Sequence, residues 1–336
     1  MSRIKKLFRM TGVPVITMLI VMIIIVVYFQ SNFFKLSALN NSLISWTPLI
    51  LLSMGQAVVL ISGGLDLSSG TAMAMMLCIL GKTMQTATPQ SGALALLLVI
   101  LAATVVGLIN GIAVGYLRLP PLVATFATSY MWLGIGLFIM PTPGGHCANW
   151  MRLFYDFTAV TNMPQWLVWI AKTIPTSFIL IVFVTVAWFI ISKTKTGRYF
   201  YAVGSNRDTA YDSGIHTART MLKAYMINAY FCMFCALFYM GQNQSASARL
   251  GDSLTLRCIA AAVIGGIAIT GGKGSVYLAI AGAVVLSLVN KIIFFANVPI
   301  AYQVVVGGVI IIAAIALSST VEIRRERALL RGGGRL

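Results

Sequence analysis

The sequence has few charged residues, and very few of those are acidic. Only 9% of its 336 residues are charged and seven are Asp or Glu, whereas 59% are hydrophobic. Soluble domains carry about a quarter of their residues as charged side chains, so this composition excludes an ordinary soluble fold. The scarcity of acids also argues against a carrier driven by protons or sodium, which needs carboxylates inside the membrane. Asp66 is the one acid that approaches an apolar segment.

Residues typical of catalytic and metal sites are equally scarce. The two histidines, His146 and His216, are expected on opposite sides of the membrane, so they predict no metal site. Cys232 and Cys235 form a CxxC pair inside an apolar stretch, which indicates buried structural cysteines. The stretch GGKGS at 271–275 departs from the phosphate-loop pattern at two positions. We therefore expect no enzymatic activity and no bound cofactor or metal in this chain.

Long apolar runs fill most of the chain. Windows of about 20 apolar residues, each long enough to cross a hydrocarbon core of roughly 30 Å as a helix, recur at 13–30, 42–62, 69–88, 92–116, 120–141, 165–191, 219–241, 254–271, 274–295 and 298–317. Small residues inside several of them allow close helix packing. The sequence therefore predicts an all-α integral membrane protein, a compact bundle of about ten transmembrane helices in a single domain over 1–336.

Lysine and arginine are distributed unevenly between the connections of these spans. Of the 24 basic residues, seventeen fall in one set of connections and seven in the opposite set. The smaller set comprises Lys35, Lys82, Arg152, Lys172, Arg249, Arg257 and Lys291. Because basic residues concentrate in cytoplasmic loops, both termini and their short basic tails are expected in the cytoplasm. This topology and contact with the lipid bilayer explain the net charge of +17 without nucleic acid.

Two apolar stretches are interrupted in the same way. Residues 60–75 and 268–280 each contain an apolar run, Ser or Thr, Gly-Gly, a short polar link and a second apolar run. Paired breaks of this kind indicate internal repeats and backbone near a substrate path; the alternative is two tight turns. Asp66 lies in the first break. Asn110 lies within another span, either as an interhelical hydrogen bond or as part of a translocation path.

The longest predicted cytoplasmic connection, residues 192–218, contains a short polar helix. This helix is predicted at residues 205–215, with Ser205 or Asn206 as its N-cap and Gly214 at its end. A basic patch before it is expected to hold the connection at the membrane surface.

Two residues of this helix, Tyr211 and Ile215, are expected on one face. A surface helix held between two spans is a rigid element that another protein can grip.

This connection resembles the cytoplasmic coupling loop of the sugar-type permeases of ABC importers, the ribose, xylose, galactose and autoinducer group. The family pattern Y-A-[IV]-G-x-N-x-x-A-A-x-x-S-G-I is matched at Tyr201, Ala202, Val203, Gly204, Asn206, Ala210, Ser213, Gly214 and Ile215. Three further stretches resemble family motifs in the family's order: GGLDLSSG, NGIAVGYLRLPPLVATFAT and IAAAVIGGIAITGGKGSV.

The resemblance implies a permease subunit of the bacterial cytoplasmic (inner) membrane that imports a small polar solute, such as a monosaccharide. It implies a dimer with a second permease copy, identical or different. It further implies cytoplasmic ATPase subunits that bind ATP-Mg, and an extracytoplasmic solute-binding protein. An ion-coupled secondary carrier and a membrane scaffold without transport activity are the alternatives.

The resemblance also assigns roles to residues. It implies contacts with the ATPase for Gly204, Ser205, Asn206, Ala210, Tyr211, Gly214 and Ile215. The substrate path is expected to include Asp66, Asn110, Thr125 and Arg257.

The chain departs from the family pattern in two places. Thr255 and Arg257 stand where acidic residues are common. Either the cargo or the docking surface of the binding protein is more acidic than usual, or the change is structural drift. In the coupling loop, Asp212 replaces a frequently apolar or basic residue, which can tune the choice of partner.

Overall fold

The computed structural model of the protein describes residues 12–84, 88–155 and 175–296, with isolated positions at 299, 302, 305, 308 and 309. Its helices are α2 (Val13–Phe29), α3 (Leu36–Ile61), α4 (Ser69–Thr83), α5 (Pro89–Gly115), α6 (Pro121–Ile139), η1 (Asn149–Phe154), α8 (Thr176–Lys193), α9 (Lys195–Ser205), α10 (Arg207–Asp212), α11 (Thr217–Asn243), η3 (Ala248–Gly251), α12 (Asp252–Ile264) and α13 (Val276–Phe295). The described residues form no β-strand, and one isolated antiparallel bridge joins Gly144 to Ala246.

Among the described residues, six helices are long and apolar enough to cross a membrane: α3, α5, α6, α8, α11 and α13. The 17-residue α2 is only slightly shorter. Exposed apolar side chains recur every three or four positions along α5, at Leu97, Leu101, Val105, Leu108 and Ile112. Such a stripe covers one face of a helix and faces lipid here. The chain is therefore an all-α, multi-pass membrane protein, as its composition predicts.

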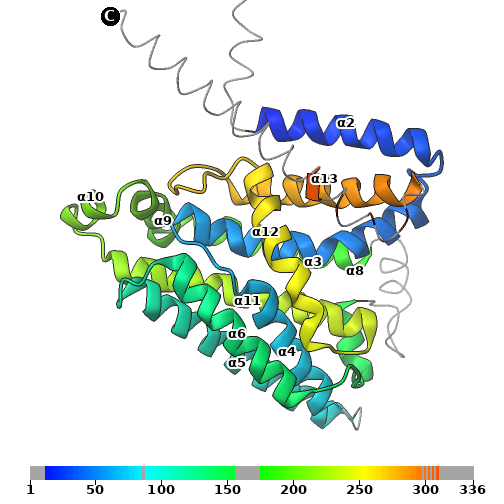
Figure 1. Ribbon diagram of the computed structural model, residues 1–336, viewed down its shortest axis with the longest axis horizontal. Coiled ribbons are helices and arrows are strands. Elements are labelled where there is room, and N and C mark those ends of the chain that lie inside the picture. The colour runs from blue at the N-terminus through cyan, green and yellow to red at the C-terminus, as the bar shows by residue number, and fades with distance from the viewer. Residues whose placement is uncertain are drawn as a thin grey trace, which may run out of the picture.

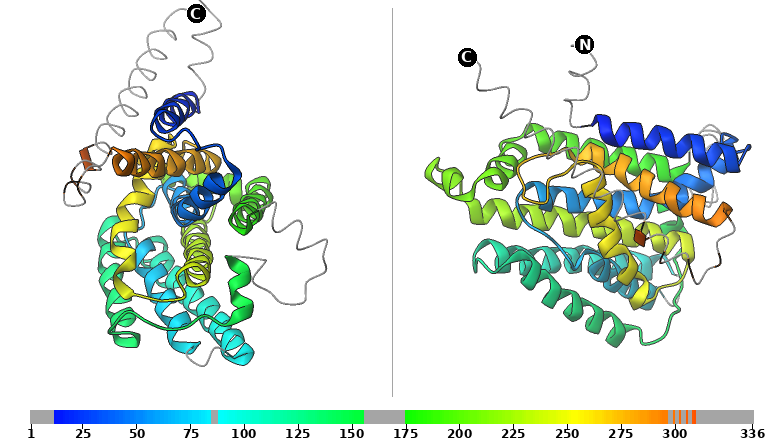
Figure 2. Two further views of the ribbon diagram at one scale, coloured as in Figure 1. Left: turned by 90° about the vertical axis from the view of Figure 1, so that its right-hand side faces the viewer. Right: turned by 45° about the horizontal axis from the view of Figure 1, so that its top comes forward.

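Helices α3 and α11 form the centre of the bundle. Figures 1 and 2 show α2 and α13 on one side of them and α5 and α6 on the other. α11 packs along α5 and against α3 and α4, while α13 packs against both α2 and α3. α9 and α10 project from one end of the bundle (Figure 1).

Two of the predicted spans contain helices too short to cross a membrane. α4 has 15 residues and α12 has 13, which is about 22 and 20 Å of helix against a hydrocarbon core of roughly 30 Å. The predicted bounds 69–88 and 254–271 are therefore too long, because α4 ends at Thr83 and α12 at Ile264. After Ile264 the chain stays largely apolar although it has left the helix. Both short helices start inside the bundle, where Gly70 and Gly251 are in backbone contact that leaves no room for a Cβ.

Two other predicted spans lie partly or wholly outside the described residues. The span predicted at 165–191 appears as α8, which starts at Thr176, and residues 156–174 are not described. The span predicted at 298–317 is described only at isolated positions. The count of ten spans therefore stays a prediction.

Candidate functional site

The break between α3 and α4, residues 62–68, is held inside the bundle by hydrogen bonds to a carboxylate. Asp66 is only 3% exposed. Its Oδ1 accepts hydrogen bonds from the backbone N–H and the hydroxyl of Ser68, both at 2.7 Å, and its Oδ2 accepts one from Nδ2 of Asn228 at 2.7 Å. A buried carboxylate needs such donors to offset its lost hydration. Asp66 therefore ties the break to α11, which carries Asn228.

Side chains of α6 and α11 satisfy backbone groups of the same break. The carbonyl oxygen of Leu65 accepts hydrogen bonds from the hydroxyls of Thr125 (3.2 Å) and Tyr225 (3.0 Å), and the N–H of Leu67 donates to Thr125 Oγ1 (3.0 Å). Irregular backbone at membrane depth is tolerated only with such partners, because no lipid group can replace them.

Asn110 and Gln56 extend this network to α5 and α3. Asn110 donates through Nδ2 to Ser68 Oγ at 2.8 Å, and its Oδ1 accepts a hydrogen bond from Thr128 at 2.7 Å. The interhelical hydrogen bond considered for Asn110 is therefore present. With its amide oriented to suit its neighbours, Gln56 accepts from the N–H of Asp66 (3.2 Å) and donates to its carbonyl oxygen (3.1 Å).

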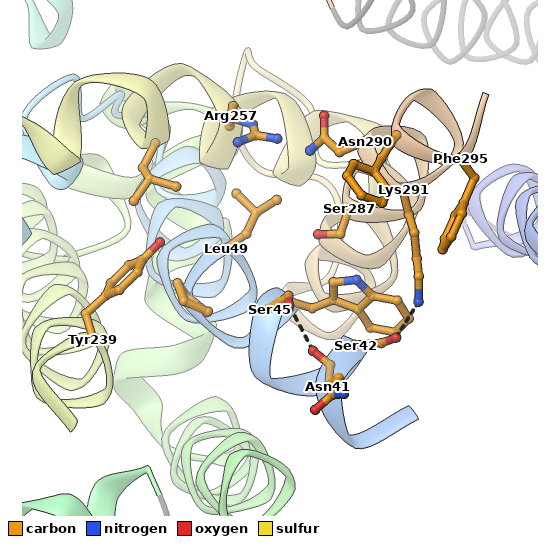
Figure 3. A pocket seen from close by; sticks show the side chains of 14 residues that line it. Asn41, Ser42, Ser45, Leu49, Tyr239, Arg257, Ser287, Asn290, Lys291 and Phe295 are labelled. Carbon is orange, nitrogen blue, oxygen red and sulfur yellow. Dashed lines mark hydrogen bonds between the residues drawn. The ribbon is translucent and has the colours of Figure 1, made fainter. Parts of the chain in front are cut away.

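Three of the four residues predicted on the substrate path lie in this network. Asp66 is part of the 62–68 break, and Asn110 and Thr125 both form hydrogen bonds with it. Arg257 does not join them: it lines a separate cavity between α3, α12 and α13 (Figure 3). Burial and hydrogen bonding place the first three as structural supports of the break.

Sequence reasoning missed other members of the network, among them Gln56, Tyr225 and Asn228. All three are buried at 1% exposure or less. Each is a polar side chain inside an apolar span, which is a signal that can be read from sequence. Asn228 nevertheless lies 162 positions from Asp66, so no local pattern connects the two.

A cavity of about 360 Å³ lies beside the network, between α4, α6 and α12. Leu67 of the break and Thr71 of α4 line it, together with Ser129 and Thr255. The hydroxyl of Thr255 accepts a hydrogen bond from the N–H of Gly70 at 3.1 Å. The start of α4 is therefore in contact with α12 at the edge of this cavity.

The helix predicted at 205–215 is present as the shorter α10, and a second helix that was not predicted, α9, precedes it in the same connection. Asn206 separates them with an extended backbone. Its Oδ1 accepts hydrogen bonds from the N–H groups of Asp208 (3.0 Å) and Thr209 (2.9 Å). Of the two N-caps considered, Asn206 is therefore correct. Gly214, with φ of +80°, follows the last turn of α10, close to where the sequence predicts the end.

The predicted pairing of Tyr211 and Ile215 on one helix face is wrong. α10 ends at Asp212, so Ile215 lies beyond it and packs, partly buried, against a small apolar cluster that includes Ala210 and Val203. Tyr211 is instead 65% exposed. The segment thus presents Tyr211 to its surroundings and is anchored through Ala210 and Ile215.

The end of α9 touches both breaks at a place that we call the glycine junction: Ile61, Gly63, Gly204 and Gly272. A Cβ on Gly204 would overlap the carbonyl oxygen of Ile61 and lie 2.7 Å from the backbone nitrogen of Gly272. The N–H of Gly272 donates to the carbonyl oxygen of Ile61 at 2.9 Å. A Cβ on Gly63 would lie 3.4 Å from the Cα of Gly204. The two breaks and the coupling segment therefore meet backbone to backbone.

Arg207 connects α10 to the end of α5. Its Nη2 donates to the carbonyl oxygens of Val114 (3.2 Å) and Gly115 (3.3 Å), at a helix end where carbonyls lack intrahelical partners. Burial lowers the pKa of the Arg207 guanidinium, and the charge of Arg118 acts in the same direction. A guanidinium nevertheless stays charged in proteins. α10 is thereby attached to the helix that carries Asn110.

The described residues contain no group of three or more His, Cys, Asp or Glu side chains that could hold a metal ion. The five cysteines are buried and free. This agrees with a structural role for Cys232 and Cys235.

Residues 38–315 match the protein family described as "Branched-chain amino acid transport system / permease component". The chain belongs to this permease family. Membership makes the permease a transport subunit rather than an enzyme, as expected from its sequence.

Named relatives of the permease are import permeases of similar length. It is 28% identical over 323 residues to the galactose/methyl galactoside import permease protein of Salmonella typhimurium, covering 92% of this chain and 94% of the relative. The corresponding Haemophilus influenzae protein is 28% identical over 316 residues, with 90% and 92% covered. The autoinducer 2 import system permease protein of Photorhabdus laumondii is 27% identical over 296 residues, with 88% and 85% covered. The predicted family resemblance is confirmed. No solved structure matches the chain.

Replacing Asn228 with Ala is expected to destabilise the permease. The change leaves Asp66 Oδ2 without its 2.7 Å donor, and a buried acceptor without a partner costs about 1–3 kcal/mol. The measurement is the apparent thermal unfolding midpoint of the purified chain in detergent at one fixed heating rate. Asn243→Ala, at an exposed position near the end of the same helix, is the matched control. Equal midpoints for the two variants would contradict the anchoring role of Asn228.

Gly204→Ala is expected to disrupt the glycine junction. The new Cβ would meet backbone atoms of Ile61 and Gly272, which cannot rotate away as a side chain can. Overpacking of this kind costs about 1–3 kcal/mol. Gly134→Ala is the control, because a Cβ there meets nothing within 4 Å. We expect a lowered unfolding midpoint for the first variant and an unchanged or raised one for the second; the reverse order would refute close packing at the junction.

Proposed function

We propose that the permease is the membrane-spanning subunit of an ATP-driven importer for a small polar solute, a monosaccharide or a related compound. Its named relatives import galactose, methyl galactoside and autoinducer 2. The observation that carries the proposal is the glycine junction, where the exposed coupling segment contacts both breaks of the bundle without intervening side chains.

In this proposal a cytoplasmic ATPase subunit binds α9 and α10 and hydrolyses ATP-Mg, and the permease transmits the resulting displacement. Force on α9 reaches Ile61 and Gly63 through Gly204. Gly63 belongs to the 62–68 break, which also contains Asp66 and continues into the start of α4. Force on α10 reaches α5 through Arg207. Both routes end at the buried network, so the break and the cavity beside α4 are the parts that switch between outward and inward openings.

The proposal includes the topology and the partners expected from the sequence. Ten spans place both termini in the cytoplasm of a bacterium, with the permease in the inner membrane, and the basic connections support this orientation. A second permease copy, identical or different, completes the membrane part, and an extracytoplasmic solute-binding protein delivers the solute to the opposite end from α9 and α10. The whole chain acts as one permease domain.

An ion-coupled secondary carrier is the alternative, and it would use Asp66 to bind the coupling ion. Within the described residues, however, the carboxylate is already occupied by Ser68 and Asn228. Uptake into proteoliposomes separates the two functions. The importer needs the ATPase partner, the binding protein and internal ATP, whereas uptake driven by a proton or sodium gradient without ATP would overturn our proposal.

Tyr211→Ala is expected to weaken binding of the ATPase subunit. The side chain is 65% exposed on α10, and exposed tyrosines at the centre of interfaces often contribute enough binding energy for their loss to lower affinity about tenfold. The measurements are copurification of the ATPase subunit with the full-length permease and the ATPase activity of the complex. We expect both to fall while the unfolding midpoint of the permease stays unchanged.

The control for this experiment is Tyr28→Ala. Tyr28 is 86% exposed on α2, away from the coupling segment. If Tyr211→Ala copurifies and hydrolyses ATP as well as Tyr28→Ala does, α10 is not the contact that we propose.

A further inference from the structure

A cavity of about 420 Å³ lies between α3, α12 and α13 and has no role in the coupling route described above. Its lining includes Ser42 and Ser45 of α3, Arg257 of α12, and Asn290 and Lys291 of α13. Ser45 and Asn290 are exposed, so the cavity reaches the surface of the described chain. Its size lies within the range of roughly 300–1,000 Å³ typical of sites for small molecules.

The cavity lies at the opposite end of α3 from the glycine junction. Ser42 is in the second turn of α3, whereas Ile61 is its last residue, and the 19 positions between them span about 28 Å of helix. Asn290 and Lys291 belong to the last two turns of α13. In the proposed topology this is the extracytoplasmic end, where a solute enters.

Two cationic side chains face this cavity from different helices. Lys291 donates from Nζ to Ser42 Oγ at 2.7 Å and lies 4.8 Å from the ring centroid of Phe33. Figure 3 shows Lys291 reaching across the cavity from α13 to α3, with Arg257 on the α12 side near Asn290. No Asp or Glu belongs to the lining. Both charges are therefore held beside the same space without a carboxylate to balance them there.

The N–H donors of the Arg257 guanidinium are not used by other described residues. The structure gives it no hydrogen bond or ion pair with another described residue, although its side chain is partly buried. A guanidinium carries five N–H donors in a planar fork that matches a carboxylate or phosphate. Leaving such donors unpaired in a partly buried place is costly, so this arrangement points to a ligand that brings the acceptors.

We propose that the α3–α12–α13 cavity binds an anionic group, a carboxylate or a phosphate, between Arg257 and Lys291. Arg257 takes the group through paired N–H donors, and Lys291 supplies a second positive charge. Asn290 adds a neutral amide donor and acceptor to the lining, and Ser45 and Ser287, whose hydroxyls donate to carbonyl oxygens of their own helices, add acceptors. These groups suit the hydroxyls of a sugar. An acidic sugar satisfies both parts of the site.

The same charges would also bind the headgroup of an anionic lipid, since the site is at one end of a membrane helix. The binding of an anionic group stands by itself. Its assignment to a transported solute rests on the proposed function, so the experiment separates the two sources.

The test is binding to the purified full-length chain in an uncharged detergent, without the ATPase subunit. Calorimetric titrations compare D-galacturonate and D-galactose 6-phosphate with neutral D-galactose at one ionic strength. In parallel, unfolding midpoints are measured in nanodiscs of phosphatidylcholine with and without phosphatidylglycerol. Binding to the isolated chain needs no partner, so its failure is distinguishable from failure of the Tyr211 experiment.

We expect an acidic sugar to bind more tightly than galactose, and Arg257→Gln and Lys291→Gln each to weaken that binding about tenfold or more. Arg257→Lys keeps the charge but not the paired donors, so it should retain part of the affinity. The control is Lys35→Gln, which removes a positive charge from an exposed position in the connection before α3. It should bind like the unmodified chain.

Two outcomes would support the proposal and two would overturn it. Loss of acidic-sugar binding in the Arg257 and Lys291 variants identifies the solute as the source of the anion. Loss of a stabilising effect of phosphatidylglycerol in the same variants, without sugar binding, identifies a lipid headgroup. The proposal is wrong if no anion binds, or if anions bind equally to the unmodified chain, both Gln variants and Lys35→Gln.

Discussion

A helix that is interrupted inside a membrane must find hydrogen-bond partners for its free backbone groups, and this requirement organises the centre of the permease. The break after α3 obtains its partners from side chains of α3, α5, α6 and α11, and Asp66 collects three of the bonds. The bonds to the N–H groups of Leu67 and Ser68 and to the carbonyl oxygen of Leu65 replace bonds that a continuous helix would have made within itself. Four helices therefore converge on a segment of seven residues, 62–68. Of these four, only α3 is adjacent to the segment in sequence.

This convergence explains how a small external movement can reach the middle of the bundle. Contacts through flexible side chains can absorb displacement by changing rotamer, whereas the glycine junction places backbone against backbone. The same α3 carries the junction at its last residue and the cationic cavity near its first turns. In the proposed importer, α3 therefore connects the end that contacts the ATPase subunit to the end where we propose that an anionic group binds. Packed helices of this kind transmit discrete shifts.

Much of the architecture could be predicted because it depends on properties that are local in sequence. Apolar runs longer than the hydrocarbon core predict spans, and Asn206 and Gly214 predict the start and the end of a short helix. Local reasoning failed where apolar residues leave the helix. The residues that follow α12 within the predicted span 254–271 are largely apolar, so hydropathy merged them with a helix of only 13 residues; the predicted span 69–88 likewise runs beyond the 15 residues of α4.

The candidate site shows the same division. Asp66, Asn110 and Thr125 could be selected from sequence because each is polar beside or within an apolar stretch, and the glycines of the coupling segment belong to a recognisable motif. Their partners could not be selected. Asn228 and Gln56 are as polar and as buried, yet nothing in their neighbourhood relates them to a loop elsewhere in the chain. Arg257 lies apart from the other three residues predicted on the substrate path, and it lines a different cavity from Thr255, two positions before it on α12.

By itself, the sequence determined that this chain is a helical membrane permease without an enzymatic site of its own, because composition, hydropathy and motif spacing act along the chain. Only the tertiary structure decided that the two glycine breaks meet at Gly204, that Asp66 is anchored by Asn228, and that Arg257 shares a cavity with Lys291. These are contacts between segments distant in sequence, and their partners are chosen by helix packing, which brings together backbone and side chains that no local pattern connects.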